Sequence, residues 1–356
     1  MYNIMEKYGL NDEFISQATN YQNLFIGRIY EQHRDLYRVV TENGRLDAVV
    51  AGKLAFNAVT KAHFPAVGDF VMLDRDTQGS GNAIIHHILS RKTLLSRQAS
   101  GTGNEEQIIA SNIDTIFICM SLNADFNLRR LERYLTIAWD SMATPVIVLT
   151  KSDLCHELND RLTEVKIVTM GVDVVVCSSN NGEGLEDIVS YISQGKTIAF
   201  VGSSGVGKST LINHLVGEEM LSTSFIREND DKGRHTTTYR QLILLPDGGI
   251  VIDTPGMREL QIASGNLSKV FEDIEELALQ CKYHDCTHNS EPKCAVMRAI
   301  RDETISVERY ESYVKLQREM SYDGLNHREL ENEKNNRMFG STAKMKEIKK
   351  HNKKHF

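Results

Sequence analysis

The feature that most constrains this fold is the glycine-rich pattern in IAFVGSSGVGKSTLINHL, residues 198–215. Gly202-x4-Gly207-Lys208-Ser209 matches the Walker A pattern in full, and it stands between a predicted strand and a predicted helix. In this arrangement, backbone N–H groups and the positive end of the helix dipole bind phosphates. A chance glycine-rich turn would need neither flanking element. The sequence therefore predicts a nucleotide-phosphate site inside an α/β domain.

The residues of this loop have expected roles toward the phosphates. Lys208 is expected to reach the β- and γ-phosphate oxygens, and the Ser209 hydroxyl is expected to bind Mg²⁺, so we predict both as catalytic. The predicted nucleotide-binding residues of the loop are Gly202, Ser203, Ser204, Gly205, Val206, Gly207, Lys208, Ser209 and Thr210.

Two later segments complete the predicted phosphate site. Asp253 ends the strand in GIVIDTPG, where a carboxylate can hold the magnesium shell, and Gly256 can offer its N–H to the γ-phosphate. DKGRHTTTYR, residues 231–240, is polar and without apolar periodicity, as expected of a segment ordered by γ-phosphate and Mg²⁺. A plain solvated loop is the alternative. The second hydroxyl to the magnesium would come from one of Thr236, Thr237 and Thr238, among which the sequence does not choose, and Thr237 is carried as the working candidate.

A second group of motifs predicts recognition of guanine. Thr150-Lys151-Ser152-Asp153 follows the buried strand PVIVLT. An Asn-Lys-x-Asp sequence at such a strand end binds guanine, because the carboxylate accepts the N1 and N2 protons and the lysine stem covers the base. Adenine lacks those donors and would leave the carboxylate unpaired. Thr150 stands in the Asn position, so one hydrogen bond replaces the two-sided contact of the amide.

The order of these motifs along the chain predicts a circular permutation. Ser178 and Ser179, in CSSNNGEG, stand at the next strand end, where small residues let backbone N–H groups approach the guanine oxygen. The base elements thus precede the phosphate elements. A doubly wound sheet needs strands that are neighbours in space, not in sequence. We therefore predict a circularly permuted P-loop GTPase domain over residues 108–262, with a mostly parallel sheet and helices on both faces.

The residues before this domain predict a small β-barrel. Residues 1–21 form an N-terminal arm that is polar and weakly patterned, as in a short helix or a loose arm. Over residues 22–98, about five short apolar segments alternate with turn residues at hairpin spacing. This pattern favours a closed barrel of the OB kind, and another small barrel or a sandwich is the alternative.

The segment CKYHDCTHNSEPKC, residues 281–294, predicts a metal site. Three thiolates and one imidazole satisfy a closed tetrahedral zinc site, which would stabilise a helical module at 263–325 that has little core of its own. His284 is the less favoured alternative ligand. The predicted zinc ligands are Cys281, Cys286, His288 and Cys294.

The composition of the chain indicates its cellular compartment and its partners. Six cysteines in 356 residues are too few for a disulfide framework, and the chain has no 18-residue apolar run and no signal peptide. We therefore expect a cytoplasmic protein without a membrane partner, acting as a monomer. The net charge of −7 argues mildly against nucleic acid, but the tail at 326–356 differs, because the last nineteen residues hold six lysines and one glutamate.

The whole layout resembles the small-subunit-dependent GTPases of bacteria, the RsgA (YjeQ) family, over about residues 22–320. The motifs that support the resemblance are RKTLLSRQ, GSSGVGKSTLIN, GRHTTT, DTPGMRE and CTHNSEPKCAV. It implies a late assembly factor that binds the small ribosomal subunit, hydrolyses GTP in response to it and is then released. Thr150, the N-terminal arm and the long tail depart from the usual family pattern. A permuted GTPase switch acting on a non-ribosomal RNA or protein is the alternative.

The segment at 231–240 and the segment that follows Asp253 are the first and second switches expected of a GTPase, and the second also bears on mechanism. Met257 follows Gly256, where Ras-type GTPases place a water-orienting glutamine, so intrinsic hydrolysis should be slow. His235 is our candidate for the missing catalytic group, and a satisfied loop histidine is the alternative. We expect the barrel and the basic tail to contact ribosomal RNA through phosphates and stacked bases, although the tail could also be solvated and without a partner.

Overall fold

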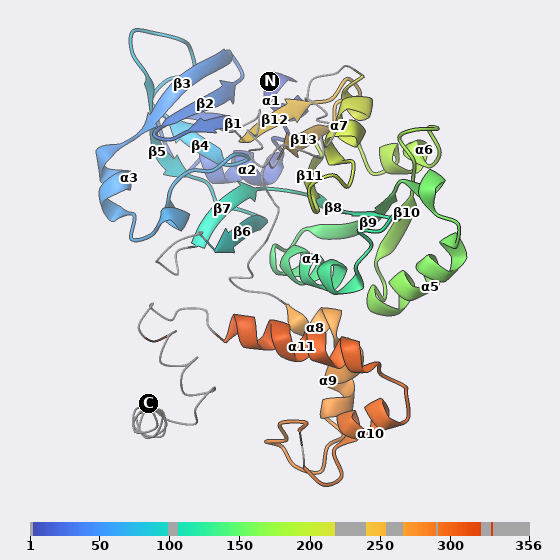
Figure 1. The fold of residues 1–356 in the computed structure, drawn as a ribbon. Coiled ribbons are helices and arrows are strands. Elements are labelled where there is room, and N and C mark those ends of the chain that lie inside the picture. Colours follow the sequence, from blue (N-terminus) through green and yellow to red (C-terminus); the bar gives the residue numbers. More distant parts are fainter. Residues whose placement is uncertain are drawn as a thin grey trace, which may run out of the picture.

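The computed structural model has three parts, shown in Figure 1: a barrel with two N-terminal helices, a central α/β domain and a C-terminal group of helices. Among the residues described, no helix has the length and apolar character needed to cross a membrane. The structure describes residues 3–98, 106–217, 240–253, 266–289, 291–321 and 329.

Two short helices precede the barrel, α1 (Asn3–Lys7) and α2 (Asp12–Ala18). The side chain of Asn11 caps α2 by accepting from the backbone N–H groups of Glu13 and Phe14. Phe14 is buried, and its ring lies 4.2 Å from that of Phe70, centroid to centroid. The described part of the arm is therefore not loose but packed on the barrel.

Five strands form the barrel, and the prediction of an OB-like barrel is confirmed. Their order is β1-β2-β3-β5-β4, and a further β1–β4 pairing closes the sheet on itself. The β3–β5 pair is parallel, and the chain between β3 and β4 forms α3 (Gly52–Asn57) and a 3₁₀ turn, Lys61–His63. The strands are β1 (Phe25–His33), β2 (Leu36–Thr41), β3 (Gly44–Val50), β4 (Phe70–Leu73) and β5 (Ala83–Ile88).

The central domain has the permuted sheet that the motif order predicted. The strand order is β10-β9-β8-β11-β13-β12, in which β12 alone runs antiparallel to its neighbour. Strands far apart in sequence thus meet side by side, as the permutation requires. The strands are β8 (Thr115–Ser121), β9 (Thr144–Thr150), β10 (Asp173–Val176), β11 (Thr197–Val201), β12 (Arg240–Leu244) and β13 (Ile250–Asp253).

Helices cover both faces of this sheet. Two helices, α4 (Leu128–Asp140) and α5 (Leu158–Val168), bury their apolar residues in one core cluster. The other two, α6 (Leu185–Val189) and α7 (Lys208–Val216), pack into a second cluster on the opposite face. Helices on both faces of the sheet agree with the prediction from the sequence.

The junction between the barrel and the central domain had no signal in the sequence. Strand β12 pairs with β1, with Gln241 opposite Glu31, so one eleven-stranded sheet runs through both parts. A two-stranded ribbon lies beside it, β6 (Leu94–Gln98) and β7 (Glu106–Ser111). The guanidinium of Arg28, fully buried here, donates to the carbonyl oxygens of Tyr8, Gly68 and Asn112. The barrel and the central domain therefore share a polar joint.

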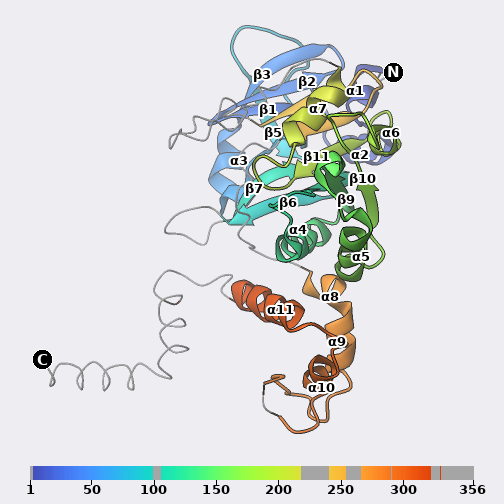
Figure 2. The same cartoon turned by 45° about the vertical axis from the view of Figure 1, so that its right-hand side comes forward.

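The C-terminal helices form the part drawn in orange and red in Figure 2, beyond α4 and α5. Phe271 and Ile274 are buried at its centre, and the Phe271 ring meets Tyr313 edge-on at 5.4 Å. We call this part the C-terminal module. Its helices are α8 (Leu267–Val270), α9 (Glu272–Ala278), α10 (Ala295–Arg301) and α11 (Val307–Met320).

Candidate functional site

The predicted phosphate loop connects β11 to α7, as the Walker A pattern requires. Gly202 has φ +148°, and a Cβ placed there would lie 2.5 Å from the carbonyl oxygen of Cys119 on β8. That separation is too short for any side chain, so glycine is required where the loop crosses the neighbouring strand. Gly207, with φ +100°, caps the start of α7. The loop therefore begins and ends at positions whose backbone conformation favours glycine.

The side chains of this loop are arranged for anion binding. Lys208 opens α7, and its Nζ donates to the carbonyl oxygens of Gly202 (2.6 Å) and Ser203 (2.7 Å), so the ammonium group lies across the mouth of the loop. Ser209 follows in the first helical turn. Ser204 and Gly205 are exposed at the tip, whereas the side chain of Val206 is buried in the core, which leaves its backbone to face the loop.

The predicted base motif lies against the phosphate loop, although the two are about fifty residues apart in the chain. The Thr150 hydroxyl, at the end of β9, donates to the carbonyl oxygen of Val206 at 2.6 Å. Lys151 adopts a left-handed conformation, φ +59°, and its Nζ donates to the carbonyl oxygen of Gly205 at 2.7 Å. Lys151 thus bridges the base motif and the phosphate loop. Thr150 uses its hydroxyl on the loop, a role that the sequence did not reveal.

The carboxylate of Asp153 is held in place by the neighbouring strand end. The Ser178 hydroxyl donates to its Oδ1 at 2.6 Å, and Asn180 Nδ2 donates to its Oδ2 at 3.3 Å. The backbone N–H of Ser178 donates to the carbonyl oxygen of Glu183. Ser178 therefore meets the site through its hydroxyl and not through the amide that we expected to approach guanine. The role of Asn180 was missed, although it lies in the motif CSSNNGEG.

One polar atom in this corner has no partner among the described residues. The Ser152 hydroxyl is buried and makes no hydrogen bond to any of the residues that the structure describes. Ser152 lies between Lys151 and Asp153, and its own N–H donates to the carbonyl oxygen of Cys177. Ser179, at the end of the neighbouring strand, is half-buried. A buried hydroxyl without a partner fits a site that is completed by a polar ligand.

Several expected site residues lie outside the described part of the chain. These include both switch segments, so their arrangement stays a prediction. Asp253 ends β13 as expected, next to β11 and the phosphate loop, but only its backbone is described. The expected residues outside the described ranges are His235, Thr236, Thr237, Thr238, Gly256 and Met257.

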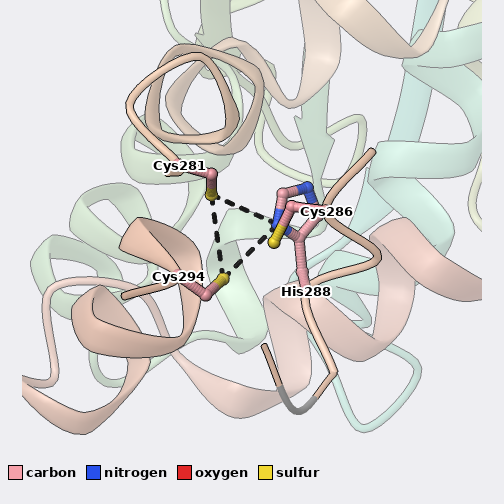
Figure 3. Close-up of side chains that lie close together, drawn as sticks. All are labelled: Cys281, Cys286, His288 and Cys294. Atoms are coloured by element: carbon pink, nitrogen blue, oxygen red, sulfur yellow. Dashed lines mark hydrogen bonds between the residues drawn. The ribbon is translucent and has the colours of Figure 1, made fainter. Parts of the chain in front are cut away.

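Figure 3 shows the four predicted zinc ligands gathered around one point. Their ligand atoms all lie within 4.8 Å of one another. Cys281 Sγ lies 3.8 Å from Cys294 Sγ and 3.5 Å from His288 Nδ1. A tetrahedral zinc with Zn–S bonds of about 2.3 Å and Zn–N bonds of about 2.0 Å separates its ligand atoms by about 3.5–3.8 Å. The cluster thus fits zinc, and His284 is exposed and not part of it.

Hydrogen bonds shape the loop that holds the cluster. The backbone N–H of Ala295, at the start of α10, donates to Cys281 Sγ at 3.3 Å. Burial acts to raise the pKa of the Cys281 thiol, but hydrogen bonds such as this one leave that pKa below its ordinary value. Tyr310 donates its hydroxyl to the carbonyl oxygen of His288, which has φ +56°. The carboxylate of Glu291 accepts from the N–H groups of Thr287 and Asn289.

Two of the remaining cysteines behave as small hydrophobic residues. Cys119 and Cys177 are fully buried in the central sheet, and burial raises the pKa of each thiol to about 12. Thiols buried in apolar surroundings are unreactive, and both pack in the apolar cluster beneath the sheet.

A phosphate loop and a base-binding corner at one edge of a permuted sheet define a circularly permuted P-loop GTPase. A family model described as RsgA GTPase matches residues 88–263. A small ribosomal subunit biogenesis GTPase RsgA 2 of Lactiplantibacillus plantarum is 56% identical over 343 residues, covering 96% of this chain and 97% of that protein. An RsgA 1 of Listeria innocua is 46% identical over 90% of both chains. The protein belongs to the RsgA GTPase family.

Solved structures agree with this assignment. The crystal structure of YjeQ from Thermotoga maritima matches with a TM-score of 0.61 and 28% identity, covering 83% of this chain and 98% of that one. YloQ, described as a circularly permuted GTPase, matches with a TM-score of 0.58 and 26% identity, over 85% of this chain and 96% of that one. The family resemblance that the motifs suggested is confirmed, and GTP with Mg²⁺ follows as the substrate of such a GTPase.

Proposed function

We propose that this protein binds the small ribosomal subunit, assists its late maturation, and is released when the subunit stimulates GTP hydrolysis. The supporting observation is that the phosphate loop and the base motif meet at one sheet edge, in a chain 56% identical to a protein named as a small ribosomal subunit biogenesis GTPase. A GTPase of this family could also act on a non-ribosomal partner, and the experiment below separates the two.

The nucleotide would lie along the edge formed by the ends of β9, β10 and β11. Asp153, oriented by Ser178 and Asn180, would accept the guanine N1 and N2 protons on its remaining lone pairs. Lys151 would cover the base, since its ammonium already reaches the loop at Gly205. The N–H groups of residues 202–210 and the ammonium of Lys208 would bind the phosphates.

Magnesium would be held by Ser209 together with Thr237 and would neutralise charge on the phosphates. Asp253 at the end of β13 would hold its hydration shell, and the N–H of Gly256 would contact the γ-phosphate. In our proposal His235 then supplies the group that positions water, because Met257 has no polar atom that could orient it. Slow turnover in isolation and faster turnover on the subunit would follow.

The other parts would make the ribosome contacts. The barrel at 22–98 and the basic tail at 326–356 would bind ribosomal RNA, the tail through its lysines. The module at 263–325 would hold one structural zinc through three thiolates and an imidazole, since the distances among Cys281, Cys294 and His288 match a tetrahedral site and Cys286 lies within 4.8 Å of them. The permutation joins the second switch directly to this module, so GTP would fix its orientation.

The direct test is GTP turnover by the purified full chain, with and without purified small ribosomal subunits. We expect slow turnover alone and a clear stimulation by small subunits, but not by large subunits. Lys208→Ala should lose both activities while remaining folded, because the positive charge at the phosphates is gone. ATP should not replace GTP. Equal turnover with and without small subunits would overturn the ribosomal part of the proposal and favour a different partner.

A further inference from the structure

Helix α4 lies between the phosphate loop and the C-terminal module, and one of its faces contacts the loop. Arg130 Nη1 donates to the Ser203 hydroxyl at 2.7 Å and to Asp125 Oδ2 at 2.8 Å. One turn further along, the Tyr134 hydroxyl lies 3.4 Å from the same Ser203 oxygen. Residues four apart share a helix face, so Arg130 and Tyr134 together fix the second residue of the phosphate loop.

Another face of α4 is bound to the C-terminal module. Arg133 makes two hydrogen bonds with the carboxylate of Glu319 on α11, at 2.6 and 2.7 Å. Glu132 is fully buried, and its carboxylate accepts from Arg309 Nη1 at 2.9 Å and from the Ser312 hydroxyl at 2.6 Å, both on α11. Near the other end of α4, the ammonium of Lys269 on α8 lies 4.3 Å from the centre of the Trp139 ring.

Arg309 connects α4 to several helices of the C-terminal module, and we call these contacts the joint. Arg309, with 5% of its side chain exposed, also binds Asp273 of α9 through two hydrogen bonds of 2.7 and 2.8 Å and donates to the carbonyl oxygen of Val270. A buried ion pair that loses one partner leaves an uncompensated charge, so such a joint resists sliding or separation. Helix α4 thus contacts the phosphate loop and the C-terminal module at once, and a displacement of the module that α4 follows would move Arg130 relative to Ser203.

We propose that the C-terminal module positions the phosphate loop through α4, with Arg130 as the positioning residue at the loop and the Arg133–Glu319 and Glu132–Arg309 pairs as the joint to the module. The proposal rests on the nucleotide site described above and deepens it. It gives the module an effect on nucleotide affinity along a route separate from the second switch. By reciprocity, the state of the phosphate loop also biases where the module lies.

A purely structural role for these contacts predicts something different. In that case, breaking them would lower the unfolding temperature and leave nucleotide affinity unchanged in the folded protein. Two substitutions would then act independently. A positioning role predicts a change in nucleotide affinity in a folded protein, and this change should disappear once Arg130 no longer connects α4 to the loop. Double-mutant analysis separates the two.

The test measures the Kd of fluorescent GDP, and the KM and kcat for GTP, in full-length variants whose folding is checked by thermal unfolding. Arg133→Met breaks the half-exposed pair without opening the core, and should raise the GDP Kd and the KM by about 2- to 30-fold. The exchanged pair Arg133→Glu with Glu319→Arg should restore both values. Arg161→Met is the matched control, since Arg161 forms a half-exposed helical pair with Glu164 within α5.

The double variant gives the decisive result. In an Arg130→Met background, adding Arg133→Met should have no further effect on the Kd, because the connection is already cut. Glu132→Gln should act like Arg133→Met if the protein remains folded. If it does not fold, the Arg133 variants test the proposal by themselves. The inference is overturned if Arg133→Met leaves the Kd and KM at the Arg161→Met values, or if the effects of Arg130→Met and Arg133→Met simply multiply.

Lys208→Ala distinguishes this failure from a failure of the nucleotide site itself. If Lys208→Ala keeps full turnover, the phosphate loop is not the active centre and both proposals fail. If Lys208→Ala loses turnover while Arg133→Met behaves as the control, only the positioning role of the module is wrong.

Discussion

The hydrogen bond from Thr150 to the phosphate loop gives the sharpest single-residue prediction. Thr150 has 3% of its surface exposed, and its hydroxyl donates to the carbonyl oxygen of Val206 at 2.6 Å. Thr150→Val keeps the shape and removes the donor. Leaving a buried polar group without its partner costs about 1–3 kcal/mol. For a domain of this size, each kcal/mol lowers the unfolding temperature by about 2–4 °C, so we expect a decrease of about 2–12 °C.

Part of that cost should appear in nucleotide binding. The bond joins the end of β9 to the loop before any nucleotide arrives, so most of the loss is one of stability. The remainder should weaken the binding of GDP, because the base motif is no longer held at a fixed distance from the phosphate loop. Thr150→Asn can make the same bond to Val206 and add an amide contact to the base, and should bind GDP more tightly than the parent protein.

The assay is thermal unfolding with and without GDP, combined with titration of fluorescent GDP. Thr150→Ser is the matched control, because it keeps the hydroxyl and loses only a methyl group. If Thr150→Val and Thr150→Ser unfold at the same temperature and bind GDP equally, the hydroxyl contributes nothing and the reasoning is refuted.

The remaining predictions concern the base, the metal and the ribosome. Asp153→Asn should weaken the binding of GTP by about 10- to 150-fold and reduce the preference for GTP over ATP in a competition assay, since an amide presents a donor where the guanine protons arrive. The parent protein should contain about one zinc per chain by elemental analysis, and Cys286→Ser should loosen the C-terminal module in a proteolysis assay; a metal-free parent would refute the site. A non-hydrolysable GTP analogue should retain the protein on small subunits in co-sedimentation better than GDP does, and equal retention would exclude control by the nucleotide. His235→Ala should lose the subunit-stimulated part of turnover, and full stimulation would remove this residue from the mechanism.

Much of the site could be predicted from the sequence, because its determinants are local. The spacing of glycines, lysine and serine in the phosphate loop and the four metal ligands within fourteen residues are each set by residues close together in the chain. Apolar periodicity also predicted the alternating strands and helices. The order of the motifs then required a permuted sheet, which the strand order confirms.

Contacts between distant segments had no comparable signal. Glu132 reads as the polar side of an amphipathic helix, yet it is fully buried, because Arg309 and Ser312 meet it from 177 and 180 residues away. Strand β12 follows a polar segment and was not expected, and its pairing with β1 is decided by the docking of the barrel. Thr150 looked like a weakened base contact until the fold placed it against Val206. Sequence pattern fixes which side of an element is apolar, but the partner of each polar side chain depends on packing across the whole chain, and only the tertiary structure decides it.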